Sequence, residues 1–199
     1  MVKLFDHQVD ALKSCEGLNR VAFYHDMGLG KTFTGAEKLV RLNGRVNLVI
    51  CQKSKIDDWL DHFKQYYSSE FSIHDLTKKR DFSSFITASL QNKCSLGIIN
   101  YDLVFRRKEI ASIQLDTIML DESSLIQNET SKRSKFILKK LCFKNIVLLS
   151  GTPTNGKYEN LWSQLHLLGW EISKDLFWKH YIDYEWQDQN GFPLKVVKG

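Results

Sequence analysis

A glycine-rich stretch directly after a short apolar run constrains the fold of this chain more than any other feature of its sequence. The apolar run covers residues 21–24, and the stretch after it comprises Met27, Gly28, Leu29, Gly30, Lys31 and Thr32. Where a strand turns into a helix, glycines let successive backbone N–H groups point inward, and the helix N-terminus favours an anionic ligand. The pattern therefore predicts a phosphate-binding loop in an α/β domain.

Two side chains of this loop have predicted roles. Lys31 would reach the β- and γ-phosphates of a nucleotide, and the Thr32 hydroxyl would bind a magnesium ion. The general pattern has another glycine five residues before Gly30, where this chain has His25. Because the loop is incomplete by itself, the prediction of ATP and magnesium as ligands depends on further motifs.

Two more apolar segments end in residues that phosphoryl transfer requires. Residues 117–120 precede Asp121 and Glu122, and residues 145–149 precede Ser150, Gly151, Thr152 and Pro153. Buried parallel strands deliver the residues that follow them to one edge of a sheet. Asp121 would hold the magnesium, and Glu122 would orient and deprotonate the attacking water. The hydroxyl residues after the last strand would sense a γ-phosphate.

In this order the motifs resemble those of the Swi/Snf-type branch of the superfamily 2 helicases and translocases. Residues 27–32 match the family's M-G-L-G-K-T, with Tyr24, His25 and Asp26 where A-D-E is usual. Residues 121–124 read D-E-S-S in place of D-E-A-H or D-E-A-D, and residues 150–153 match S-G-T-P. The resemblance implies that hydrolysis is coupled to movement through Ser124, Ser150, Gly151 and Thr152. Ser124 replaces the residue that usually contacts the S-G-T-P motif, and its hydroxyl can make only a shorter contact.

Other segments that resemble the family imply contacts with the base and with nucleic acid. Residues 4–8 resemble its glutamine motif, in which Gln8 would read the adenine edge. Four residues correspond to positions that face the tracked strand: Lys53, Ser54, Asn100 and Tyr101. Arg106 and Arg107 follow the last of these, and phosphate contacts there would be independent of sequence and sensitive to salt. The other basic clusters, at residues 78–80, 132–135 and 139–140, are each more often solvated helix faces when taken singly.

Strand and helix signals alternate along most of the chain, which predicts a parallel sheet flanked by helices. We expect a single RecA-like lobe over residues 1–170. An aromatic-rich tail over residues 171–199, helical or extended, would lead from it toward a second lobe. The aromatic residues of the C-terminal part are open to three interpretations. They pack against the sheet, they stack on bases, or they cover a surface shared with the second lobe.

The resemblance implies that the motor needs a second RecA-like lobe, which supplies arginines to the γ-phosphate. Nothing after Pro153 resembles the G-R-x-x-R motif of that lobe. We therefore expect an incomplete motor that binds ATP better than it hydrolyses it, with duplex DNA as its partner and a monomeric state. Loss of such an arginine costs about three to five orders of magnitude in related hydrolases.

Composition agrees with a nucleotide-dependent enzyme of the cell interior. The 199 residues are 43% hydrophobic and carry a net charge of +5, which favours polyanions modestly. The four cysteines lack metal-ligand spacing, and neither a signal peptide nor a membrane span is evident. We expect an intracellular, cytoplasmic protein without a membrane partner. The D-E-S-S form and the short loops also resemble bacteriophage-encoded members, which would place the protein in the host cytoplasm.

Other nucleotide-binding classes fit less well. A small GTPase would need N-K-x-D, and an ABC-type ATPase would need L-S-G-G-Q; neither is present. The nearest competitor within the superfamily is a DEAD-box-like RNA helicase lobe, against which D-E-S-S and M-G-L-G-K-T argue. From a different class, the chain could be a nucleotide-gated nucleic-acid-binding module without productive hydrolysis.

Overall fold

The computed structural model describes residues 3–91, 94–189 and 192–197. Its centre is a six-stranded sheet in which every pairing is parallel and the strand order is β1-β6-β5-β2-β4-β3. The strands are β1 Arg20–Phe23, β2 Val46–Cys51, β3 Ser72–Asp75, β4 Ser95–Asn100, β5 Gln114–Asp121 and β6 Cys142–Leu149. The predicted α/β fold with a parallel sheet is thus confirmed.

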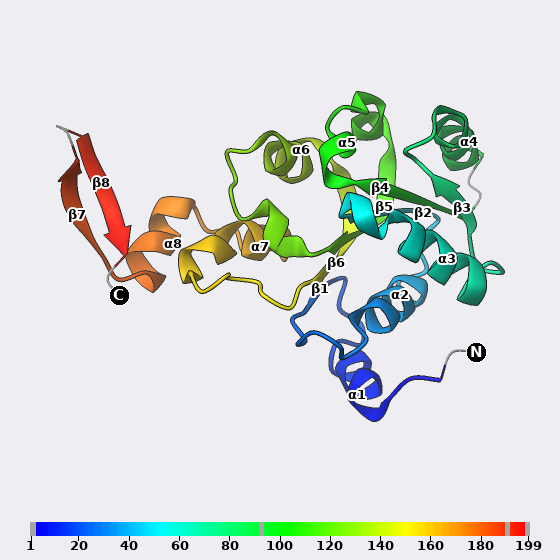
Figure 1. Ribbon diagram of the computed structural model, residues 1–199, viewed down its shortest axis with the longest axis horizontal. Coiled ribbons are helices and arrows are strands. Elements are labelled where there is room, and N and C mark those ends of the chain that lie inside the picture. Colours follow the sequence, from blue (N-terminus) through cyan, green and yellow to red (C-terminus); the bar gives the residue numbers. More distant parts are fainter. Residues whose placement is uncertain (1–2, 92–93, 190–191, 198–199) are drawn as a thin grey trace.

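Helices follow the strands and cover both faces of the sheet (Figure 1). They are α1 Asp6–Ser14, α2 Lys31–Arg41, α3 Ile56–Tyr66, α4 Lys79–Leu90, α5 Tyr101–Val104, α6 Lys132–Lys140, α7 Trp162–Leu167 and α8 Lys174–Tyr181. None of the helices in the described part of the chain is long and apolar enough to cross a membrane.

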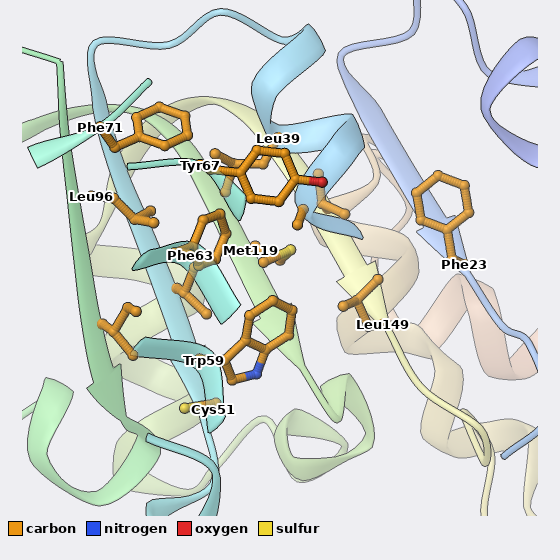
Figure 2. Packing of buried hydrophobic residues seen from close by; sticks show 14 of the residues in the cluster. Phe23, Leu39, Cys51, Trp59, Phe63, Tyr67, Phe71, Leu96, Met119 and Leu149 are labelled. Atoms are coloured by element: carbon orange, nitrogen blue, oxygen red, sulfur yellow. The ribbon is translucent and has the colours of Figure 1, made fainter. Parts of the chain in front are cut away.

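The two faces of the sheet carry separate apolar cores. Helices α1, α2 and α3 pack on one face, where Phe63 and Tyr67 lie against Met119 of β5 (Figure 2). Helices α4 to α7 cover the other face with residues such as Phe85 and Ile137. All six residues of β2 and of β4 are buried, as expected for strands covered on both sides. A sheet fixed from both faces holds the loops at its edges in defined positions.

The strand order determines which loops meet. Strands β1, β6 and β5 are neighbours, with Phe23 and Asp121 both paired to Leu149. Their carboxyl ends carry the phosphate loop, the S-G-T-P motif and the acidic pair. Strands β2 and β4 are also neighbours, with Cys51 paired to Asn100. Their ends carry the two segments expected to face nucleic acid.

The C-terminal segment differs from the helical tail in one respect. After α8 the chain forms an antiparallel hairpin of β7 Tyr184–Gln189 and β8 Phe192–Val197, which lies far from the sheet (Figure 1). Its sequence signal is the pair Asn190-Gly191 between two β-prone runs, outside the described residues. Lys195 lies over the rings of Tyr184 and Trp186. The rings of Tyr184 and Trp186 contact each other, with their centres 6.2 Å apart, in a hairpin that lies far from the sheet (Figure 1). The boundary at residue 170 stays a prediction.

Candidate nucleotide and nucleic-acid site

The phosphate loop takes its shape from two glycines. Gly28 and Gly30 have φ angles of 85° and 71°, in the left-handed region that side chains with a Cβ rarely adopt. Helix α2 begins at Lys31, directly after Gly30. Lys31 Nζ donates to the carbonyl oxygens of His25 at 2.8 Å and Asp26 at 3.0 Å. The ammonium group thus lies within the concave side of its own loop, with Thr32 in the first turn of the helix.

Gln8 supports this loop from α1. Its side chain is 2% exposed, and its Oε1 accepts a hydrogen bond from the backbone N–H of Phe5 at 2.9 Å. Its Nε2 donates to the carbonyl oxygen of Gly30 at 3.1 Å. A Cβ on Gly30 would lie 2.4 Å from Nε2, so a side chain at this position would displace the Gln8 amide. Gln8 therefore has a structural role, and its reading of adenine stays a prediction.

Asp121 ends β5 in a half-buried position. Its Oδ2 accepts a 2.8 Å hydrogen bond from Nε1 of Trp59 on α3, a partner that the helical pattern alone did not reveal. Burial raises the pKa of the Asp121 carboxyl above its usual value, since removal from water disfavours the charged form. A carboxylate here and the Thr32 hydroxyl are oxygen ligands of the kind magnesium prefers, and magnesium takes its remaining ligands from phosphates and water.

Glu122 is held by two hydroxyl groups. Ser124 Oγ and Ser150 Oγ each donate to Oε1 of Glu122 at 2.6 Å. Glu122 also has a φ of 58°, a left-handed backbone conformation that costs a non-glycine residue on the order of 1 kcal/mol. The acidic pair and the S-G-T-P motif thus meet through the carboxylate of Glu122. This arrangement replaces the short contact expected between Ser124 and the S-G-T-P motif.

The S-G-T-P turn also lies next to the phosphate loop. The Thr152 backbone N–H donates to Ser150 Oγ at 3.1 Å, which fixes the turn. A Cβ added to Gly151 would be 3.5 Å from Lys31 Nζ. Lys31, Glu122 and Ser150 therefore converge at one edge of the sheet, as the strand order requires.

The nucleic-acid candidates divide into two groups. Lys53 and Asn100 line two adjoining surface hollows at the ends of β2 and β4; Ser54 lines one of them and Arg106 the other. The two hollows together form a groove, which Arg133 of α6 also lines. The sequence motifs do not identify Arg133 as a nucleic-acid contact, and its place in a basic helix is the one sequence signal for that role. Lys53, Ser54 and Arg106 are exposed and available to a polyanion, whereas Asn100 is buried. Carboxylates also line the two hollows, and one of them, Asp102, lies 3.8 Å from the Arg133 guanidinium.

Tyr101 and Arg107 are placed differently. Tyr101 is 2% exposed, and its hydroxyl donates to the backbone carbonyl of Asp121 at 3.0 Å. Arg107 donates to the carbonyl oxygen of Thr77 at 3.1 Å, and its guanidinium lies 4.7 Å from the ring centre of Phe82. Their sequence positions suggested nucleic-acid contacts, but burial and internal hydrogen bonds favour structural roles for both.

Comparisons with known proteins agree with this geometry. Residues 12–190 match the model of the SNF2-related domain. The chain is 29% identical to the yeast ISWI chromatin-remodeling complex ATPase ISW2, over 94% of this chain and 17% of that protein. It is also 29% identical to the human chromatin-remodeling ATPase INO80, over 86% of this chain and 11% of that protein. The chain thus spans less than a fifth of these relatives.

Among solved structures, the fold is similar to the Sulfolobus solfataricus SWI2/SNF2 ATPase core in complex with dsDNA. The TM-score is 0.73 at 22% identity, and the match covers 89% of this chain and 38% of that one. This likeness shows the shared fold. A bacteriophage origin stays a prediction. Since the family model covers nearly the whole length, the chain belongs to the SNF2-related domain family.

Proposed function

We propose that this chain is the ATP-binding and hydrolysing lobe of a duplex-DNA translocase motor. One observation carries the proposal: the phosphate-loop lysine, the acidic pair and the S-G-T-P serine converge at one sheet edge, where Ser124 and Ser150 both hold Glu122. Family membership and the relatives named as ATPases support ATP as the ligand.

The residues divide the work of hydrolysis. Lys31 would leave the loop carbonyls for the β- and γ-phosphates, since phosphate oxygens are stronger acceptors for an ammonium group. Thr32 and Asp121 would hold a magnesium ion, which neutralises charge on the phosphates. Glu122 would accept a proton from the attacking water. The remaining lone pair of Gln8 Oε1 would accept a hydrogen bond from the adenine amino group.

Duplex DNA would lie along the groove lined by Lys53, Asn100, Arg106 and Arg133. The solved structure with the same fold contains dsDNA, which favours DNA over RNA. The full cycle would require arginines from a second lobe, since an arginine that reaches the γ-phosphate accelerates related hydrolases by about 10³ to 10⁵.

The test is ATP turnover with no nucleic acid, with duplex DNA and with duplex RNA, each with and without an added second lobe. We expect slow turnover by the lobe alone and a large gain when the second lobe and duplex DNA are both present. Preference for RNA would favour an RNA helicase lobe. Nucleotide-dependent DNA binding without turnover in any condition would favour the nucleotide-gated nucleic-acid-binding module.

A further inference from the structure

A single buried glutamine joins the three motifs of the nucleotide site. Gln164 lies on α7 and has no exposed surface. Its Oε1 accepts hydrogen bonds from Tyr24 Oη at 3.0 Å and from Ser123 Oγ at 2.6 Å. Its Nε2 donates to the carbonyl oxygen of Pro153 at 2.7 Å. One side chain thus satisfies two hydroxyls and one carbonyl from three separate segments.

Each partner is close in sequence to a group of the nucleotide site. Tyr24 precedes His25, whose carbonyl oxygen holds Lys31. Ser123 follows Glu122, and Pro153 ends the turn that begins with Ser150. The amide of Gln164 therefore connects the entry to the phosphate loop, the acidic pair and the S-G-T-P turn without touching a reacting atom.

The two hydroxyl partners share a further property. Tyr24 and Ser123 both stand where the family pattern has alanine, which offers no hydroxyl. Although Tyr24 as a residue is 37% exposed, burial around its hydroxyl raises its pKa to about 12, which keeps the group a neutral donor. Two departures from the pattern, far apart in sequence, are thus satisfied by the same acceptor. Both hydroxyls therefore have an acceptor, whereas a buried hydroxyl without a hydrogen-bond partner would lower the stability of the fold.

We propose that Gln164 is a positioning residue that fixes the phosphate-loop entry, the acidic pair and the S-G-T-P turn relative to one another. The proposal rests on the function proposed above for this site. It assigns α7 a part in hydrolysis, since Gln164 is the contact through which that helix holds all three motifs. Loss of the amide should loosen the three segments together.

Amide hydrogen exchange on the ligand-free chain tests this directly. Gln127→Leu is the matched control, because Gln127 Nε2 donates to the same Pro153 carbonyl at 3.0 Å. Among the described residues, no hydrogen bond joins the Gln127 side chain to Tyr24 or Ser123. In Gln164→Leu we expect exchange to rise about tenfold or more at residues 24–26, 121–124 and 150–154. In Gln127→Leu the rise should be confined to residues near 150–155. The same confined pattern in Gln164→Leu would overturn the proposal.

An apolar version of the network separates positioning from stability. The triple variant Tyr24→Phe, Ser123→Ala and Gln164→Leu removes both hydroxyls of this network, so neither is left unpaired and the thermal midpoint should return toward that of the parent. The Pro153 carbonyl still lacks its α7 donor. Single-turnover hydrolysis, measured with protein in excess, should therefore stay about tenfold below the parent, while the Kd for ATP changes by no more than about twofold.

If the triple variant recovers both the thermal midpoint and the hydrolysis rate of the parent, Gln164 acts only in packing and the positioning role is wrong. A parent chain that fails to bind ATP would instead contradict the function proposed for the site. The exchange comparison needs no nucleotide, so it decides the positioning role in that case as well.

Discussion

The functional side chains in the two halves of the sheet edge are held in different ways. At the nucleotide half, the ends of β1, β6 and β5, the functional groups are hydrogen-bonded to protein: Gln8 to Gly30, Asp121 to Trp59, and Glu122 to two serines. At the groove half, the ends of β2 and β4, the cations Lys53 and Arg106 are exposed. Preorganised groups suit a small ligand whose reaction needs fixed geometry, whereas exposed charges suit a polyanion of any sequence.

One residue joins the halves. Tyr101 follows Asn100 of the groove, and its buried hydroxyl donates to the carbonyl oxygen of Asp121. A strand bound at Asn100 would therefore lie one residue from a group that contacts the acidic pair. The two halves differ in how their side chains are held but share a covalent and hydrogen-bonded link.

The largest effect is expected at the nucleotide half. Glu122→Gln keeps the size of the side chain but removes the base, so turnover should fall by about 10² to 10⁴. ATP binding should persist, because the carboxylate acts on water rather than on phosphate or metal. Parallel measurements of Kd and single-turnover rate check this. Loss of binding would move Glu122 into a metal or structural role.

The groove half should respond more weakly and with a dependence on salt. Arg106→Ala should weaken duplex-DNA binding by about tenfold and reduce the salt slope by about one, as expected for one lost phosphate contact. Arg107→Ala is the comparison, because its guanidinium is held by Thr77 and Phe82. It should lower stability and leave the slope unchanged. An equal loss of slope in both variants would break the distinction between exposed and structural arginines.

The link between the halves should have a smaller effect. Tyr101→Phe removes one hydroxyl and preserves the ring, so we expect a loss of about 1 kcal/mol in stability. The stimulation of turnover by duplex DNA should fall by a few-fold more than turnover without DNA. Equal changes in both rates would show that Tyr101 supports the fold without connecting the two halves.

At neutral pH the smallest effect is expected in the core beneath the nucleotide half, which responds only as the pH falls. His62 is buried among the rings of Phe33 and of aromatic residues of α3, and burial lowers its pKa to about 4. In the unfolded chain the His62 imidazole takes up a proton near pH 6.5, whereas in the folded chain it does so only near pH 4. The contribution of neutral His62 to the free energy of unfolding is therefore complete above pH 6.5 and is lost as the pH falls toward 4. The slope is at most about 1.4 kcal/mol per pH unit. His62→Phe should flatten that slope in denaturant titrations, and an unchanged slope would place the titration elsewhere.

The sequence predicted the parallel sheet and its loops because both depend on local signals. Apolar runs of β-branched residues end in glycines, acids or hydroxyls, and buried strands of this kind have few alternative arrangements. The hairpin was missed because its signal, Asn190-Gly191, lies in a segment whose many aromatic residues dominated the interpretation.

The candidate site was predictable in its motifs but not in their connections. Gln164 and Trp59 look like ordinary helix residues, and only the packing of α7 and α3 brings them to Ser123 and Asp121. Tyr101 occupies a nucleic-acid motif position yet is buried, since α5 turns its ring under the acidic pair. Long-range side-chain partners of this kind leave no periodic pattern in a sequence.

The most direct test of the central claim is the affinity for ATP of the chain and of Lys31→Ala, with Lys64→Ala as the control. Lys64 lies exposed in the last turn of α3, outside residues 27–32. We predict magnesium-dependent binding of ATP by the chain and by Lys64→Ala, and a loss of about 100-fold or more in Lys31→Ala with an unchanged thermal midpoint. Equal ATP affinity in all three proteins would contradict the assignment of residues 27–32 as the phosphate-binding loop.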